Sequence, residues 1–291
     1  YCDTMEHGIH VTQNFLTATG CQTMDELMAL TTEQLVDAYL KAAVIDKNCL
    51  LGTANFPLLD GVTLPEDRAD MYAMWGDEKR AGIGMMIGSN LDEIRYFVPT
   101  EGGEEGFLDT LRWIAKRDRA LLNDQEKAMY DAFMATLANE SEGSRLEQYC
   151  NDINFRAGNT NMAIRHAAAG GSTYMYFVRK PVTTPQLGAI HACEIPYLFD
   201  TSLPDPMGSG EIVGNDECEF RHVAKEMLVN FARTGNPSTE KYEWKKFSGD
   251  DRQTMVFDDT IGMQKDIFGK REDLMMSWAE RLGNGSSKRV C

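Results

Sequence analysis

The sequence predicts an α/β protein in which a small sheet is covered by many helices. Amphipathic segments with helical spacing alternate with short runs of aromatic and β-branched residues, an order typical of a sheet flanked by helices. Only three such runs are recognisable, too few for a complete doubly wound sheet. With 291 residues and a 43% hydrophobic composition, the chain is large enough for one substantial core. We therefore expect it to form the later strands and covering helices of a sheet that begins elsewhere.

The N-terminal elements are predicted to be short helices. They are expected at residues 11–19, 24–30 and 32–43. Either Thr31 or Thr32 should cap the third helix, because a threonine hydroxyl accepts a hydrogen bond from the free amides of a helix start. Glu33 then falls in the first turn, where a negative charge is favourable. Residues 52–65 are rich in turn-forming residues and are predicted to be a loop.

The remaining elements are three buried strands and five longer helices. The strands are expected at residues 83–87, 174–178 and 254–257. The helices carry apolar side chains at i, i+3 and i+4, and are expected at residues 106–120, 124–137, 145–169, 217–233 and 270–282. Gly170-Gly171 and Gly235-Asn236-Pro237 are typical helix stops. Residues 188–207 are predicted to be loop, and Asn90 or Asp92 could cap a turn after the first strand.

Charge and composition exclude several classes of function. The net charge is −16 and the pI is about 4.7, which argues against binding nucleic acid or an anionic membrane surface. No apolar run approaches the length of a membrane span. The seven cysteines have no CxxC spacing, which argues against a structural zinc site. We expect no metal or cofactor.

A histidine in a Gly-Ala setting is the strongest functional signal. His191 follows Gly188-Ala189-Ile190 and precedes Glu194-Ile195-Pro196-Tyr197. By itself, a loop histidine is more often a surface residue or one satisfied within the core. Glu93 follows an apolar strand beside Asp92, and such an acidic pair commonly occupies the first turn of a helix. The residue types alone are therefore consistent with two interpretations, a functional pair of residues or a structural histidine and a helix-capping acidic pair.

Four ordered segments resemble the type-B carboxylesterases, the cholinesterase and para-nitrobenzyl-esterase branch of the α/β-hydrolases. They lie at residues 57–65, 87–97, 187–199 and 231–237, the last followed by Trp244. This resemblance implies that the chain is the C-terminal portion of a single carboxylesterase domain with the α/β-hydrolase fold. The implied activity is the hydrolysis of small carboxylic esters through an acyl-enzyme on serine.

The resemblance also implies roles for individual residues. Glu93 matches the triad acid and His191 the triad base, while Asp92 becomes a cap or a support for the acid. Glu194 resembles a semi-buried family glutamate near the base, although a solvent-facing loop carboxylate is an equal alternative. Tyr197 and Phe199 either line the acyl or alcohol pocket or pack in the core.

The nucleophile is missing from the sequence. No Gly-x-Ser-x-Gly occurs, and Gly208-Ser209-Gly210 lacks the spacing. We therefore expect the serine to lie in an N-terminal half that is a separate chain or a missing segment. The alternative functions are a non-catalytic, cholinesterase-like adhesion protein and an inactive proteolytic fragment.

The predicted compartment is the cytoplasm of a bacterial-type cell. Arg156-Ala157 occupy the region where cholinesterases have a disulfide-forming Cys-Pro, which favours a reduced enzyme. Secretion remains an alternative, because the chain starts at Tyr1 and its natural N-terminus is expected to be missing.

Overall fold

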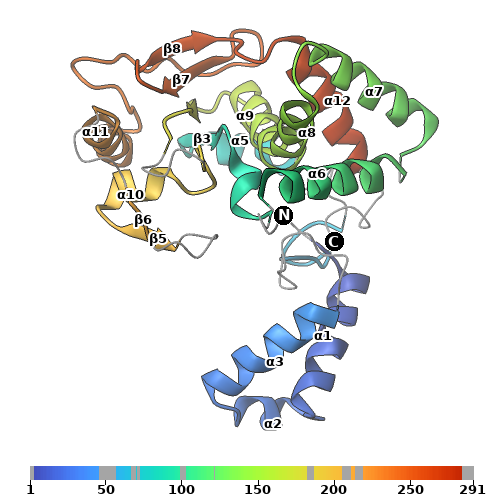
Figure 1. Cartoon of the computed structure of the whole chain (residues 1–291). Helices are drawn as coiled ribbons and strands as arrows, with labels where there is room; N and C mark the ends of the chain where they lie inside the picture. Colours follow the sequence, from blue (N-terminus) through green and yellow to red (C-terminus); the bar gives the residue numbers. More distant parts are fainter. Residues whose placement is uncertain are drawn as a thin grey trace. The chain divides into compact units, whose positions relative to one another are not determined.

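The computed structural model describes most of the chain and divides it into two compact units (Figure 1). The units comprise residues 1–71 with 282–291, and residues 72–281. The described residues are 3–45, 57–66, 70, 73–98, 103–120, 122–181, 187–204, 211–213 and 219–283.

The first unit is a helical hairpin with a two-stranded ribbon. Its elements are β1 (Asp3–Thr4), α1 (Met5–Thr19), α2 (Met24–Met28), α3 (Thr32–Ile45) and β2 (Leu58–Leu59), with β1 and β2 parallel. The three predicted helices are confirmed. Thr31 caps the third, because its hydroxyl accepts from the Gln34 amide while the Gln34 side chain accepts from the Thr31 amide. In the predicted loop, residues 52–56 lie outside the described part, and the remainder contains β2.

The second unit contains a four-stranded sheet in the order β3-β4-β7-β8. The strands are β3 (Met85–Asn90), β4 (Thr173–Val178), β7 (Gln253–Phe257) and β8 (Gly262–Lys265). The first three are parallel and match the predicted strands, whereas β8 is antiparallel to β7. The strand β8 was not predicted, because it has no β-branched or aromatic residue and lies at an exposed edge.

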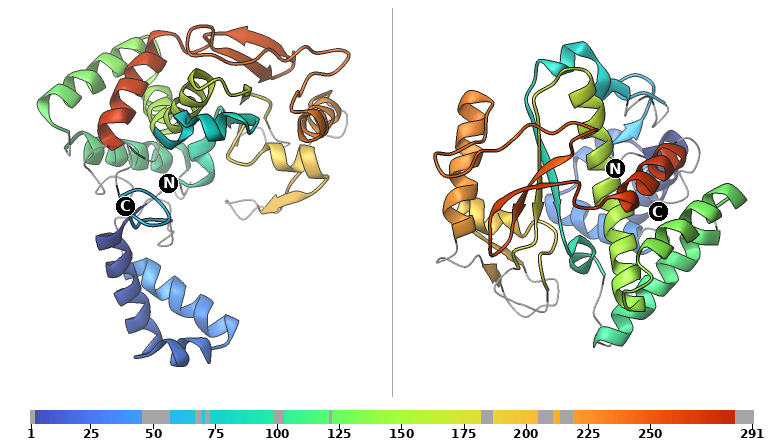
Figure 2. Two further views of the ribbon diagram at one scale, coloured as in Figure 1. Left: turned by 180° about the vertical axis from the view of Figure 1, so that it is seen from behind. Right: turned by 90° about the horizontal axis from the view of Figure 1, so that it is seen from above.

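Helices cover both faces of this sheet (Figure 2). The helical segments are η1 (Met74–Gly76), α5 (Glu78–Ala81), η2 (Glu93–Tyr96), α6 (Gly103–Ala120), α7 (Asp124–Thr136), α8 (Glu142–Asn151), η3 (Asp152–Arg156), α9 (Ala157–Ala168), α10 (Glu194–Phe199), α11 (Glu219–Thr234) and α12 (Lys270–Gly283). The side chains of β4 alternate between the faces: Tyr174 packs with the α10–α11 core, and Met175 packs against α9. This alternation gives the sheet a buried layer on each side.

Two predicted elements need correction. The helix predicted at 145–169 starts at Glu142 and contains a π turn, η3, between α8 and α9. The predicted loop at 188–207 contains α10 and a strand, β5 (Ser202–Pro204), which pairs with β6 (Glu211–Val213); residues 205–207 lie outside the described part. Pro196 suggested a loop, but it lies in the first turn of α10, where its missing N–H has no partner to lose.

Candidate active site

The predicted acid and base meet where β3 and β4 end. Glu93 begins η2, directly after β3, and His191 lies just before α10. Nδ1 of His191 is 2.6 Å from Oε2 of Glu93. The glutamate side chain is only 6% exposed, whereas that of the histidine is 41% exposed. Nε2 of His191 has no hydrogen-bond partner among the described residues and remains open for a proton transfer.

The carboxylate of Glu93 affects both the orientation and the protonation of the His191 imidazole. Oε1 of Glu93 accepts from the backbone amide of Asn90 at 2.7 Å, which leaves Oε2 for the histidine. Burial disfavours the imidazolium, but the hydrogen bond to Glu93 and the charges of Glu93 and Glu194 outweigh it, so the pKa of His191 is raised. Such a pair can keep the proton on Nδ1 and stabilise the cation that forms when Nε2 takes up a proton.

Asp92 connects two segments: the acid loop, which follows β3 and carries Glu93, and the base loop, which precedes α10 and carries His191. Its backbone amide donates to the Ala189 carbonyl at 2.9 Å, and its Oδ2 accepts from the Ala189 amide at 2.8 Å. Gly188 makes this approach possible, because it has φ +70 and a Cβ there would lie 2.1 Å from Oδ2 of Asp92. The expectation that the side chain of Asp92 or Asn90 caps the following turn is wrong, since both side chains bind the base loop instead.

The helix behind the site also holds the acid loop. Asn151, at the end of α8, donates from Nδ2 to the Leu91 carbonyl at 2.9 Å and accepts at Oδ1 from the Ile94 amide at 2.8 Å. These two bonds hold one residue that precedes Glu93, Leu91, and one that follows it, Ile94. Arg95 pairs with Glu147 on α8 through contacts of 2.5 and 2.9 Å. Asn151 and Glu147 were not predicted as part of the site, because a polar residue inside a predicted helix carries no sign of its partner.

Three aromatic rings surround the base. The ring centroids of Tyr96, Phe97 and Phe155 lie 6.3, 4.9 and 5.3 Å from that of His191. Tyr96 and Phe97 lie three and four residues after Glu93, at the end of η2, whereas Phe155 comes from the π turn η3. Turns of this kind occur often at functional sites. None of these three rings was predicted as part of the site, and they contribute to the apolar surroundings of the His191 ring.

Comparisons with known proteins show the family of the chain. The model of the carboxylesterase family matches residues 3–275. The chain belongs to the carboxylesterase family. It is 27% identical over 285 residues to the para-nitrobenzyl esterase of Bacillus subtilis (strain 168), covering 95% of this chain and 55% of that protein. It is 25% identical over 264 residues to an acetylcholinesterase of Leptinotarsa decemlineata, covering 83% of this chain and 40% of that protein.

Solved structures show the same fold. A PNB esterase superimposes with a TM-score of 0.71 at 23% identity, covering 94% of this chain and 55% of the other. A carboxylesterase of Geobacillus stearothermophilus superimposes with a TM-score of 0.68 at 22% identity and the same coverage. The expected type-B branch and partial α/β-hydrolase fold are therefore confirmed. The chain spans about half the length of these carboxylesterases.

The other predicted site residues of this carboxylesterase chain have different environments. Glu194 is half-buried, and its Oε2 accepts from Nδ2 of Asn90 at 2.8 Å, so it is not a solvent-facing carboxylate. Burial raises the pKa of Glu194, partly offset by this hydrogen bond. Tyr197 is fully buried against Phe220 and donates to the Pro181 carbonyl, which is core packing. Phe199 is 64% exposed, and its role in a pocket stays a prediction.

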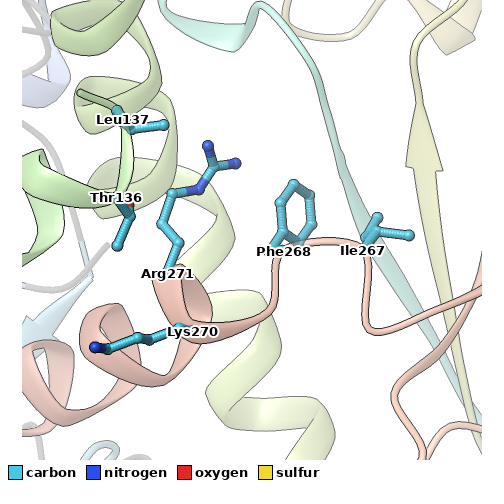
Figure 3. Close-up of a pocket in the computed structure, with 6 residues that line it drawn as sticks. All are labelled: Thr136, Leu137, Ile267, Phe268, Lys270 and Arg271. Carbon is cyan, nitrogen blue, oxygen red and sulfur yellow. The ribbon is translucent and has the colours of Figure 1, made fainter. Parts of the chain in front are cut away.

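No metal-binding cluster of three or more His, Cys, Asp or Glu occurs in the described part of the chain. None of the helices described there is long and apolar enough to cross a membrane. A cavity of about 230 Å³ lies elsewhere, between the end of α7 and the start of α12 (Figure 3). Its lining residues are Thr136, Leu137, Ile267, Phe268, Lys270 and Arg271. The cavity therefore includes neither Glu93 nor His191.

Proposed function

We propose that this chain supplies the acid and base of a serine carboxylesterase whose nucleophile lies in an N-terminal half. The observation that carries the proposal is the 2.6 Å contact between Nδ1 of His191 and the buried carboxylate of Glu93. The chain has no Gly-x-Ser-x-Gly, and it spans about half of its relatives. We call the protein that unites both halves, as one polypeptide or two, the parent protein.

The geometry supports a two-step hydrolysis. Nε2 of His191 accepts the proton of the serine hydroxyl as its oxygen attacks the ester carbonyl, and Glu93 stabilises the resulting imidazolium. The imidazolium then protonates the departing alcohol and leaves an acyl-enzyme. In the second step, Nε2 takes a proton from water, which attacks the acyl group, and the proton returns to the serine as the acid leaves.

The edge of the sheet supports the need for a second half. Among the described strands, β3 pairs only with β4 and lies at the edge of a predominantly parallel sheet. Parallel strands are normally covered and paired on both sides, and an open edge promotes aggregation. A strand of the N-terminal half beside β3 would close this edge and bring the serine near its base.

The substrate class is a small-molecule carboxylic ester. The name of the Bacillus relative, a para-nitrobenzyl esterase, supports this class. The direct test is His191→Ala in the parent protein, assayed with para-nitrophenyl acetate. The variant should lose nearly all hydrolysis, because the group proposed to accept the serine proton is removed. A near-normal kcat would refute the proposal. Presence of both triad partners disfavours the adhesion-protein alternative.

A further inference from the structure

Asn90 joins the strand of the acid to the loop of the base. It is the last residue of β3 and is 2% exposed. Its backbone amide donates to Oε1 of Glu93 at 2.7 Å. Its side-chain Nδ2 donates to the Ile190 carbonyl at 2.9 Å and to Oε2 of Glu194 at 2.8 Å. Ile190 directly precedes His191, and Glu194 follows it by three residues, so one asparagine holds the base loop on both sides of the base.

The amide group suits this place chemically. Its two N–H donors have two acceptors, a carbonyl and a carboxylate, and an aliphatic side chain or an ionised carboxylate could bind neither. The hydrogen bond to Glu194 counteracts the burial that raises the pKa of that carboxyl group. The charge of Glu194 contributes in turn to the raised pKa of His191. Asn90 therefore affects both the position of the base and the charge around it.

Building on the proposed function, we propose that Asn90 is a positioning residue, which fixes the His191 loop on the Glu93 strand and binds the Glu194 carboxylate beside the base. A purely structural role would stabilise β3 without affecting the base. The positioning role requires the pKa of His191 to fall when the amide is removed, since the contact with Glu93 loosens and Glu194 becomes easier to protonate.

The chain offers a matched control on the same strand. Asn159 of α9 donates from Nδ2 to the Gly88 carbonyl of β3 at 2.5 Å, and no described hydrogen bond connects it to Glu93 or the base loop. Asn90→Ala and Asn159→Ala each remove a side-chain amide bound to β3. Only the first should change the base.

The experiment uses the parent protein with histidines labelled at Cε1. NMR titration gives the pKa of His191, and hydrolysis of para-nitrophenyl acetate gives kcat and KM. Asn90→Ala should lower the pKa of His191 and reduce kcat by up to about a hundredfold, with KM little changed, because small displacements of catalytic groups are this costly. Asn159→Ala should lower the unfolding temperature and leave the pKa of His191 unchanged.

The outcomes separate this inference from the proposed function. The same pKa of His191 in the Asn90→Ala and Asn159→Ala proteins would overturn the positioning role, whatever the activity. If Asn90→Ala does not fold, Asn90→Leu removes both N–H donors at a similar side-chain size, and an unchanged pKa of His191 would also overturn the positioning role. Full activity of His191→Ala would refute the triad, yet the NMR comparison would still decide the role of Asn90.

Discussion

Gly188→Ala should disrupt the site through a single methyl group. Gly188 has φ +70, a conformation that side chains with a Cβ adopt at a cost. The new Cβ would lie 2.1 Å from Oδ2 of Asp92, so the carboxylate must move. That oxygen accepts a hydrogen bond from the Ala189 amide at 2.8 Å, and its displacement breaks this one of the bonds between the acid and base loops.

The expected loss of stability follows from these two effects. The left-handed backbone costs about 1–2 kcal/mol for alanine. Loss of a hydrogen bond to a charged group costs about 1.5–3 kcal/mol. The free energy of unfolding should therefore fall by roughly 2.5–5 kcal/mol. The hydrolysis rate should fall too, because the same loop carries His191.

Urea unfolding of the parent protein measures this loss, and Gly235→Ala is the control. Gly235 has φ +74, but no atom of the described residues lies within 4 Å of the place that an added methyl group would occupy. Gly235→Ala should therefore lose only about 1–2 kcal/mol and keep its kcat. Adding Asp92→Ala to Gly188→Ala removes the clash, so the two losses should not add. Equal losses for the two glycine variants, with normal hydrolysis in both, would refute the reasoning.

Three further outcomes test the proposed triad, and a fourth tests the need for an N-terminal half. Glu93→Gln should lower kcat by about three to four orders of magnitude, because an amide cannot stabilise the imidazolium. Asp92→Asn should lower kcat much less. If an ester-hydrolysis assay shows the reverse order, Asp92 is the acid. Activity should fall as pH drops through the pKa of His191, which lies above its ordinary 6.5, and a pH–rate profile should show this limb at lower pH in Glu93→Gln. Because the pKa of His191 is raised in the folded state, protonation of His191 stabilises the fold, and this contribution is complete below pH 6.5. It should disappear as the pH rises through the folded-state pKa of His191, as urea unfolding at several pH values would show. Residues 1–291 alone should not react with a fluorophosphonate probe or unfold cooperatively as a soluble monomer; labelling would reveal a nucleophile within the chain.

Local sequence patterns were sufficient for the three parallel strands and for most helices. The strands β3, β4 and β7 are short apolar runs bounded by loops, and burial on both faces produces that pattern. The edge strand β8 has no such constraint, so its composition resembles a loop. The start of α10 was missed because Pro196 looks like a helix breaker unless its place in the first turn is known.

The sequence by itself determined the fold class and predicted which residues are the acid and base, since Glu93 and His191 lie in recognisable segments. Only the tertiary structure decided what holds them. The bonds from Asn90 and Asp92 to the base loop span 100 and 97 positions, and they exist because β3 and β4 lie side by side and end at the same edge. Phe155 reaches the base from a π turn, which changes the register of the helix by one residue. Neither the pairing of two distant strands nor a π turn within a helix leaves a periodic signal in the sequence, because both depend on packing between distant segments.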